Sequence, residues 1–218
     1  TRPPIYVRAF AWSEMPQSAC LCRDPFYRPY EDFFRNRLFW ASLGDDSVFE
    51  PWVTVEAALK CRGWGVAIPR THSDQPGGSY KDDYPLKTLD DIARLRTPWH
   101  GIDEARTAEA AARLADAVGD ILTVNVDRAP AYRMWGGDLS TDLGHLRGIE
   151  HFMLDMCDNP GGVHRLVGFM AAGVEKAQAE AEAAGDWGLC AHQNQAMPYA
   201  RELPDPAPNR NGVRRSDL

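Results

Sequence analysis

The sequence predicts an α/β protein, and three observations support this fold class. Two Ala/Glu-rich amphipathic segments each end in Gly-Asp, at Gly119-Asp120 and at Gly185-Asp186. A short apolar run follows each Asp, which is typical of a strand buried in a parallel sheet. Glycine readily adopts the left-handed conformation that ends a helix, so both junctions are expected to close a helix and open a strand. Two such strands, separated by helices, are parallel if they are neighbours.

The elements expected along the chain alternate between strands and helices. From the residues alone, an open doubly wound sheet and part of a (β/α)8 barrel both fit this order. No Gly-x-Gly-x-x-Gly turn follows a strand, which removes the main support for a nucleotide-binding sheet. We expect an irregular arm over 1–29, helices over 30–43, 89–95, 103–118, 143–157 and 160–184, strands over 47–55, 121–126 and 187–191, and a β-hairpin over 63–84.

Residues that begin or end elements set several of these limits. Gly44 is expected to end the first helix, Thr88 to cap the second, and Asn159 followed by Pro160 to start the last. Pro51 predicts an interruption or a sheet edge in the first strand. The helix over 143–157 should turn one apolar face to the core, formed by Leu143, Leu146, Ile149, Phe152, Met153 and Met156.

Composition excludes several kinds of partner. The chain has 218 residues, of which 44% are hydrophobic, so one large domain with a sizeable core can form. The net charge of −7 argues against nucleic acid, because phosphate binding needs a basic face. No apolar run approaches the ~20 residues of a membrane-spanning helix. The five cysteines show no framework spacing, which favours reduced thiols in a cytoplasmic protein. We expect a small-molecule substrate, with neither nucleic acid nor membrane as partner, and a homodimer stays open.

Both ends of the sequence favour a fragment. It begins Thr-Arg-Pro-Pro without Met and stops at Leu218, soon after a proline-rich loop. We expect residues beyond Leu218 to complete the protein, and an intact mass far above 24.3 kDa would show this.

Two segments carry a resemblance to a known superfamily. Residues 144–167 read Gly-His-Leu-Arg-Gly-Ile-Glu-His-Phe-Met-Leu-Asp-Met-Cys-Asp-Asn-Pro-Gly-Gly-Val-His-Arg-Leu-Val, and residues 46–55 read Asp-Ser-Val-Phe-Glu-Pro-Trp-Val-Thr-Val. In their order and pattern they resemble the uroporphyrinogen decarboxylase superfamily, and the similarity spans residues 30–190. The resemblance implies an incomplete (β/α)8 barrel of the TIM type, its N-terminal half or so, in a domain over 30–218.

The resemblance also implies a chemistry. A decarboxylase of this superfamily removes carboxylate groups from a carboxylated tetrapyrrole, in porphyrin biosynthesis, without a cofactor. The alternative within the superfamily is a corrinoid-dependent methyltransferase, which binds zinc through His and Cys to activate a thiol. A third hypothesis lies outside catalysis, and takes the chain as a non-catalytic fragment or binding module.

The candidate site residues lie at the C-terminal ends of expected strands, where barrel enzymes hold their catalytic groups. Glu50 can hold a proton or stabilise a cationic intermediate, or it is an edge-strand residue that faces solvent. Arg128 beside Asp127 can bind a substrate carboxylate, or the two form a structural ion pair. As catalytic residues we predict Glu50, Asp127 and His192. As substrate-binding residues we predict Arg128, Tyr132, Arg133, Trp52, Gln193 and Asn194, although the aromatic and basic residues after Arg128 can equally pack the loop.

A metal site is not among these predictions. Cys190 and His192 supply two ligand types on one side of a strand, which is too few for zinc, and a structural role is the favoured interpretation. We predict no metal and no cofactor, with zinc and corrinoid required only by the methyltransferase alternative. Glu50, Asp127, Arg128 and His192 are expected to converge on one cavity.

Overall fold

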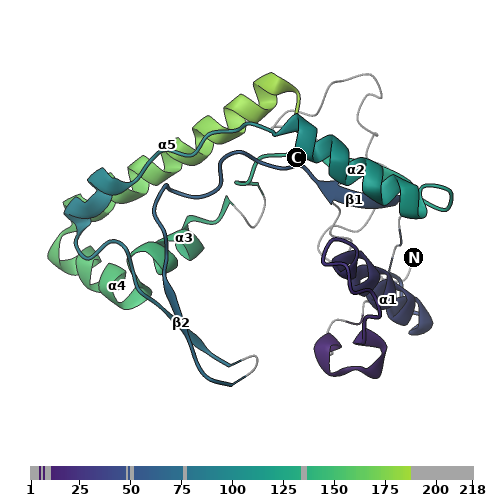
Figure 1. Cartoon of the computed structure of the whole chain (residues 1–218). Coiled ribbons are helices and arrows are strands. Elements are labelled where there is room, and N and C mark those ends of the chain that lie inside the picture. Colours follow the sequence, from purple (N-terminus) through teal and green to yellow (C-terminus); the bar gives the residue numbers. More distant parts are fainter. Residues whose placement is uncertain are drawn as a thin grey trace. The chain divides into compact units, whose positions relative to one another are not determined.

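A computed structural model describes residues 5, 7, 11–47, 49, 52–75, 78–133 and 137–187, and the statements below concern these residues. The chain is a mixed α/β protein that divides into two compact units. The first contains the residues up to Val55 together with Ala108–Asp127. The second contains Glu56–Thr107 together with the described residues from Arg128 to Trp187. Figure 1 shows the elements of both units along the chain.

The first unit contains two 3-10 turns, one whole helix, the second half of another and a two-stranded sheet. The turns η1 (Trp12–Glu14) and η2 (Pro16–Ser18) precede α1 (Arg28–Ser42), and the sheet pairs β1 (Trp52–Glu56) with β4 (Thr123–Asp127). Side chains alternate along a strand, so Val53 and Val55 of β1 point to one face, and both are buried. They pack against Leu114 of α2 (Glu104–Val118), whose second half belongs to this unit.

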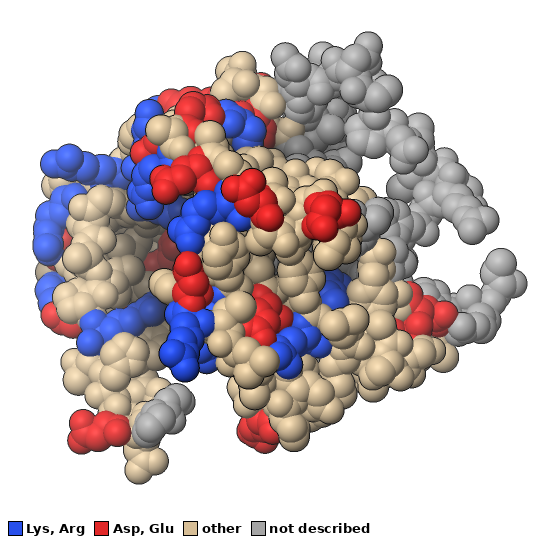
Figure 2. Space-filling view, turned by 45° about the vertical axis from the view of Figure 1, so that its right-hand side comes forward, with Lys and Arg blue, Asp and Glu red and all other residues tan. Residues whose placement is uncertain are grey.

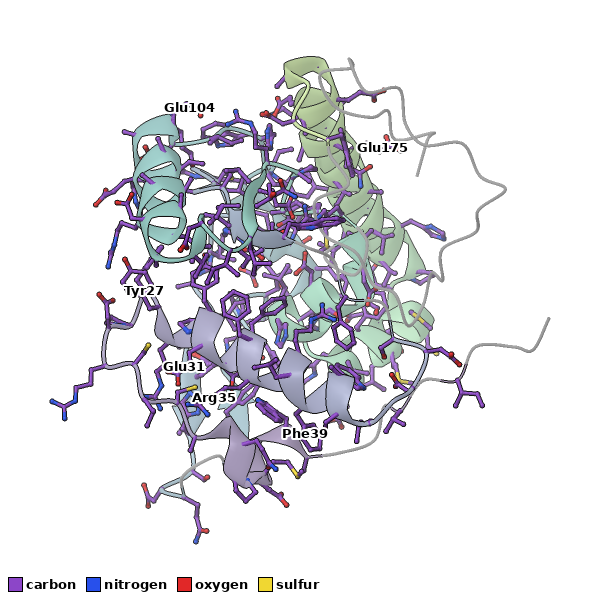
Figure 3. The ribbon with its side chains drawn as sticks, turned by 90° about the vertical axis from the view of Figure 1, so that its right-hand side faces the viewer. Tyr27, Glu31, Arg35, Phe39, Glu104 and Glu175 are labelled. Atoms are coloured by element: carbon purple, nitrogen blue, oxygen red, sulfur yellow. The ribbon has the colours of Figure 1, made fainter. Side chains whose placement is uncertain are left out.

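Glu31 fixes the segment before α1 to the helix. Its carboxylate accepts hydrogen bonds from the backbone N–H groups of Leu21 (2.9 Å) and Cys22 (2.7 Å) and from Nε of Arg35 (2.7 Å). Glu31 and Arg35 lie one turn apart on α1 (Figure 3). The hydrogen bonds from Cys22, Leu21 and Arg35 stabilise the charged form and lower the pKa of Glu31 to about 2.

The second unit contains a hairpin and a group of helices. Strands β2 (Arg70–His72) and β3 (Tyr80–Asp82) pair antiparallel, with Arg70 opposite Asp82. The 3-10 helix η3 (Leu89–Arg94) follows, and Thr88 and Asp91 cap it reciprocally. Three further helices are α3 (Leu139–Leu146), α4 (Ile149–Asp158) and the long α5 (Pro160–Ala184), against which η3, α3 and α4 pack (Figure 1).

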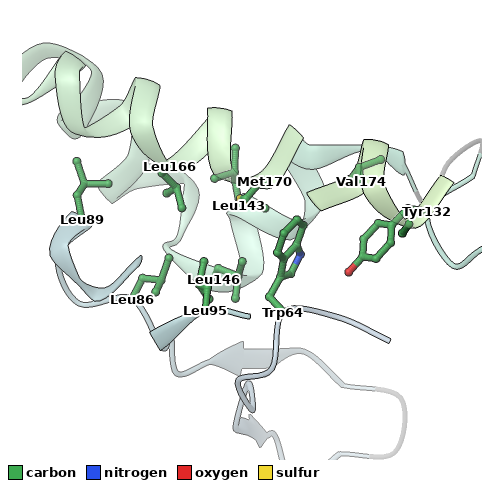
Figure 4. Close-up of a cluster of buried hydrophobic side chains, with 11 residues drawn as sticks. Trp64, Leu86, Leu89, Leu95, Tyr132, Leu143, Leu146, Leu166, Met170 and Val174 are labelled. Carbon is green, nitrogen blue, oxygen red and sulfur yellow. The ribbon is translucent and has the colours of Figure 1, made fainter. Parts of the chain in front are cut away.

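The core of this unit forms around Trp64 and the buried side of α5 (Figure 4). The indole Nε1 of Trp64 donates a hydrogen bond of 2.6 Å to Oδ2 of Asp142, so the one polar atom of the ring is satisfied within the core. The other buried members are Leu86, Leu89, Leu95, Tyr132, Leu143, Leu146, Leu166, Met170, Val174 and Ala177.

Both ends of α5 follow the prediction. The Asn159 side chain accepts a hydrogen bond of 2.9 Å from the backbone N–H of Gly162, and Pro160 occupies the first turn. At the other end Gly185 has a φ of 73°, the left-handed conformation that glycine adopts without steric cost. The first helix before Gly44 and the helix over 103–118 are confirmed, with ends that differ from the prediction by one or two residues at most. The predicted hairpin is confirmed but is shorter, because its strands cover only Arg70–His72 and Tyr80–Asp82 of the expected 63–84.

The first Gly-Asp junction differs from the prediction. Gly119 has no positive φ, and its N–H still donates to the Ala115 carbonyl oxygen at 2.7 Å, as inside a helix. The N–H groups of Ile121 and Leu122 then both donate to the Val118 carbonyl oxygen, so the turn carries the chain on and the strand begins only at Thr123.

The single helix predicted over 143–157 is wrong. The chain breaks between α3 and α4 at Gly148, whose φ of 84° is incompatible with a continuing helix. The break divides the predicted apolar face: Leu143 and Leu146 are buried, whereas Ile149, Met153 and Met156 are exposed. Phe152 alone of the α4 residues in that face packs against the core.

The sheets are smaller than predicted. The first strand begins at Trp52, after Pro51, and not at Ser47. Trp187 lies outside regular secondary structure, and 188–191 lie outside the described residues, so the pairing of that strand with 121–126 stays a prediction. Within the described ranges there are two two-stranded sheets and no closed barrel. None of the described helices is both long and apolar enough to cross a membrane.

Leu166→Ala should destabilise the protein by about 2–5 kcal/mol, because Leu166 is 0% exposed on α5 and its loss leaves a cavity. Leu154→Ala is the matched control, since Leu154 on α4 is 57% exposed and its truncation should cost within about 0.5 kcal/mol. Urea unfolding of both variants measures the difference. Equal losses would show that α5 does not bury Leu166.

Glu31→Gln should remove part of the acid sensitivity of the protein. The pKa of Glu31 in the folded state is about 2, below the ordinary value of 4.5. Its stabilising contribution is therefore complete above about pH 4.5 and is lost as the pH falls toward 2. Urea unfolding between these pH values should show that the free energy of unfolding falls less steeply with decreasing pH in the variant than in the wild type.

The control for this comparison is Glu109→Gln, because Glu109 lies exposed on α2. The free energy of unfolding of Glu109→Gln should depend on pH in the same way as that of the wild type. A Glu31→Gln profile parallel to the wild-type profile would contradict the role assigned to the hydrogen bonds of Glu31.

Candidate functional site

The structure places the predicted site residues in different surroundings. Asp127, the last residue of β4, is buried, and Trp52, the first residue of β1, is half-buried; both belong to the first unit. Arg128, Tyr132 and Arg133 belong to the second unit. The remaining ones, Glu50, His192, Gln193 and Asn194, lie outside the described residues, so the convergence of the predicted site on one cavity stays a prediction.

Arg128 lies at the centre of a charged cluster in the second unit. Its Nε donates a hydrogen bond of 2.6 Å to Oδ1 of Asp186. Its Nη1 and Nη2 donate to Oε2 and Oε1 of Glu104, at 2.9 and 2.7 Å, so the guanidinium fork holds the Glu104 carboxylate with two bonds. We call Arg128, Asp186, Glu104 and His100 the Arg128 cluster.

His100 completes this cluster from the opposite side of Asp186. Its Nε2 lies 2.7 Å from Oδ2 of Asp186, and its backbone N–H donates to Oε2 of Glu180 at 2.8 Å. The Asp186 carboxylate accepts this hydrogen bond from Nε2–H, so Nδ1 of the ring is left for another partner. In the described part of the chain this buried Nδ1 has no hydrogen-bond partner.

Exposure within the Arg128 cluster changes from one side to the other. The side chains of His100 and Asp186 are 2% and 9% exposed, that of Arg128 is 35% exposed and that of Glu104 is 67% exposed. The hydrogen bonds that Arg128 donates to Glu104 and Asp186 raise its pKa further, and those that Glu104 accepts from Arg128 lower the pKa of Glu104. A buried acid thus fixes a guanidinium whose outer nitrogens reach the solvent side.

The short connection between Asp186 and α5 explains its position. Gly185 turns the chain after the helix, and the Asp186 N–H donates to the Ala181 carbonyl oxygen at 2.9 Å. The next residue, Trp187, is buried against Ala129 and Ala181, and its Nε1 donates to the Gln178 carbonyl oxygen at 3.1 Å. Asp186 is therefore held between a capped helix end and a buried indole.

Tyr132 lies in the core and not in the Arg128 cluster. Its ring packs against Trp64 with the centroids 5.6 Å apart, and the Gln178 side chain donates to its carbonyl oxygen at 2.7 Å. Burial raises the pKa of Tyr132, which keeps the phenol protonated. These contacts match the alternative interpretation of the sequence, in which the aromatic residues after Arg128 pack the loop against the core.

Two further carboxylates in the second unit have altered acidity. Burial raises the pKa of Asp142, and the hydrogen bond from Trp64 opposes this only in part. Asp82 is buried as well, which favours its neutral form, but hydrogen bonds from His145 and Arg70 outweigh burial and lower its pKa. Such groups need a partner or a function, and Asp82 has its partners at the base of the hairpin.

Charged side chains elsewhere form local pairs. Acidic and basic groups are interspersed over much of the face drawn in Figure 2. Among the residues that the structure describes, no group of three or more His, Cys, Asp or Glu side chains is suited to hold a metal ion. The potential ligands Cys190 and His192 lie outside that part of the chain.

Sequence patterns missed three of the four members of the Arg128 cluster. His100 lies in a loop with no periodic pattern, and Glu104 looks like an ordinary acidic residue in a first helical turn. Asp186 had one available signal, since it directly follows a helix-ending glycine where an α/β chain often places functional groups.

Comparison of the chain with protein-family models, with curated proteins and with solved structures found no match in any of the three.

Asp186→Asn should lower the free energy of unfolding by about 1–3 kcal/mol, because Arg128 and His100 both lose a charged hydrogen-bond partner. Glu104→Gln is the matched control at the exposed end of the same guanidinium. Exposed ion pairs contribute little to stability, so Glu104→Gln should lower the free energy of unfolding much less than Asp186→Asn does. Urea unfolding of both variants measures these two losses. Equal losses would mean that the buried Asp186 does not hold the Arg128 cluster together.

Proposed function

We propose that this protein is an enzyme that decarboxylates a carboxylated, tetrapyrrole-like small molecule, and that Arg128 binds one of the substrate carboxylates. The observation that supports the proposal is the fixed guanidinium of the Arg128 cluster. Asp186 holds it from the buried side, while its two outer nitrogens hold a carboxylate, that of Glu104, at 2.7 and 2.9 Å.

The geometry of that pair suits recognition of a substrate carboxylate. Glu104 is mostly exposed, so another carboxylate can take its place without uncovering buried surface. The exchange replaces one negative charge by another, and the two parallel hydrogen bonds are retained. Nε stays bonded to Asp186 throughout, so the guanidinium loses little freedom when the ligand binds.

The reaction proposed for the bound substrate is a loss of CO2. Glu50 is proposed to protonate the pyrrole ring first, and the carbon–carbon bond to the carboxylate then breaks with its electron pair moving into the protonated ring. A second proton is added to the carbon that lost CO2, and the ring returns the first proton, so that the net change replaces one carboxylate by one hydrogen. Asp127 and His192 are the other proposed catalytic residues. The proposed enzyme is cytoplasmic and needs no cofactor.

The second candidate is methyl transfer, as in the zinc- and corrinoid-dependent branch of the superfamily that the sequence resembles. The Cys190-x-His192 sequence favours it, because thiolate and imidazole are zinc ligands. One assay separates the two: the purified chain is incubated with uroporphyrinogen under anaerobic conditions, and with zinc, methylcobalamin and a thiol. Loss of carboxylates, detected by mass, supports decarboxylation, and demethylation of the corrinoid supports methyl transfer. If the chain catalyses neither reaction, the result supports a binding module.

Arg128→Ala should raise the KM for the carboxylated substrate by about tenfold with a smaller change in kcat, because a two-pronged charged contact is lost. Arg106→Ala, an exposed arginine in the first turn of the same helix as Glu104, is the control and should leave KM unchanged. Glu104→Gln keeps the fold while it removes the charged competitor, so it should lower KM. Unchanged KM in both Arg128→Ala and Glu104→Gln would exclude Arg128 as the carboxylate-binding residue.

A further inference from the structure

A pocket of about 430 Å³ lies at the base of the hairpin in the second unit. Its walls come from residues 65–67, Pro69, residues 83–85, Lys87 and Arg94 of η3. None of them belongs to the Arg128 cluster, so the pocket is independent of the proposed function. Its volume lies within the range of sites that bind small organic molecules.

The walls of the pocket are held by backbone hydrogen bonds. The N–H of Asp83 donates to the Pro69 carbonyl oxygen at 2.8 Å, which closes the hairpin base. The N–H of Leu86 donates to the Leu146 carbonyl oxygen at 2.9 Å, and the Leu86 side chain is buried in the core. Because these segments are fixed before any ligand arrives, binding costs little ordering of the protein.

Two cationic side chains line the pocket. Arg94 donates from Nη1 to the Pro85 carbonyl oxygen at 2.7 Å, which fixes the guanidinium at the wall. Lys87 pairs with Asp83 at 2.5 Å through one of its three ammonium hydrogens. The lining residues thus carry two positive charges and one negative charge, and both cations are more than half exposed. Asp91 of η3, outside the lining, lies 3.7 Å from Nη1 of Arg94, so a bound carboxylate would share this guanidinium with it.

The rest of the lining is apolar or aromatic. Val66, Ala67, Pro69 and Pro85 contribute aliphatic surface. Tyr84 adds a ring, which an edge contact with His151 on α4 holds at a centroid distance of 6.2 Å.

We propose that this pocket is a binding site for a small organic anion with a flat apolar body, of the aromatic carboxylate class. The ring of the ligand would pack on the proline and tyrosine surface, and its carboxylate would meet Arg94 and Lys87. A neutral ring lacks the charged contact, and a small carboxylate without a ring lacks the apolar one, so neither alone is a good ligand.

The probe for the test is 2-naphthoate, titrated into the full chain by calorimetry, with methyl chemical shifts of Val66 and Ala67 recorded alongside. Naphthalene-2-carboxamide has the same ring without charge, and acetate has the charge without the ring. We expect 2-naphthoate to bind about tenfold more tightly than either, and to shift the two methyl signals.

Lys87→Gln and Arg94→Gln should each weaken 2-naphthoate binding about tenfold. Arg94→Lys keeps a charge and should weaken it less. Lys81→Gln is the control, because Lys81 is an exposed cation on β3 outside the pocket. Equal binding of the naphthoate and the carboxamide, no shift at Val66 or Ala67, or equal affinity in Lys87→Gln and Lys81→Gln would overturn the proposal.

Discussion

One carboxylate, that of Asp186, organises the charged part of the second unit. It accepts a hydrogen bond from Arg128 on one oxygen and from His100 on the other, although these partners are 58 and 86 residues away in the sequence. The end of α5 sets its position, because Gly185 turns the chain directly before it and Trp187 is buried directly after it. Burial makes the arrangement interdependent, since Asp186 and His100 are both buried and neither can replace this contact by water. Arg128 is more exposed and keeps its two bonds to Glu104.

This constraint links the hydrophobic core to the candidate site. The buried side of α5 packs against Trp64, Leu86 and the helices around them, so the position of the helix end follows from the core. The helix end places Asp186, and Asp186 in turn orients the guanidinium of Arg128. The more exposed atoms of that guanidinium then face Glu104, on the side that solvent can reach. A substrate carboxylate would meet a cation whose orientation the fold has already determined.

Local signals in the sequence predicted the elements whose ends are marked by particular residues. Asn159, Pro160 and Gly185 bound α5 as expected, because capping depends on the chemistry of one or two residues. The apolar period through residues 143–157 did not reveal the break at Gly148, since a glycine inside an otherwise helical pattern also occurs in continuous helices. Arg128 was recognised from its place after a strand, but its partners His100, Glu104 and Asp186 meet it only through tertiary packing, which no local pattern encodes.

Asp186 holds Arg128 in place, and a double-mutant cycle tests this directly. Free energies of unfolding are measured for Asp186→Asn, Arg128→Gln, the double variant and the wild type. Two groups in contact in a partly buried network should show a coupling energy of about 1 kcal/mol or more. Effects that add within about 0.3 kcal/mol would mean that the two side chains act independently, and would contradict the account.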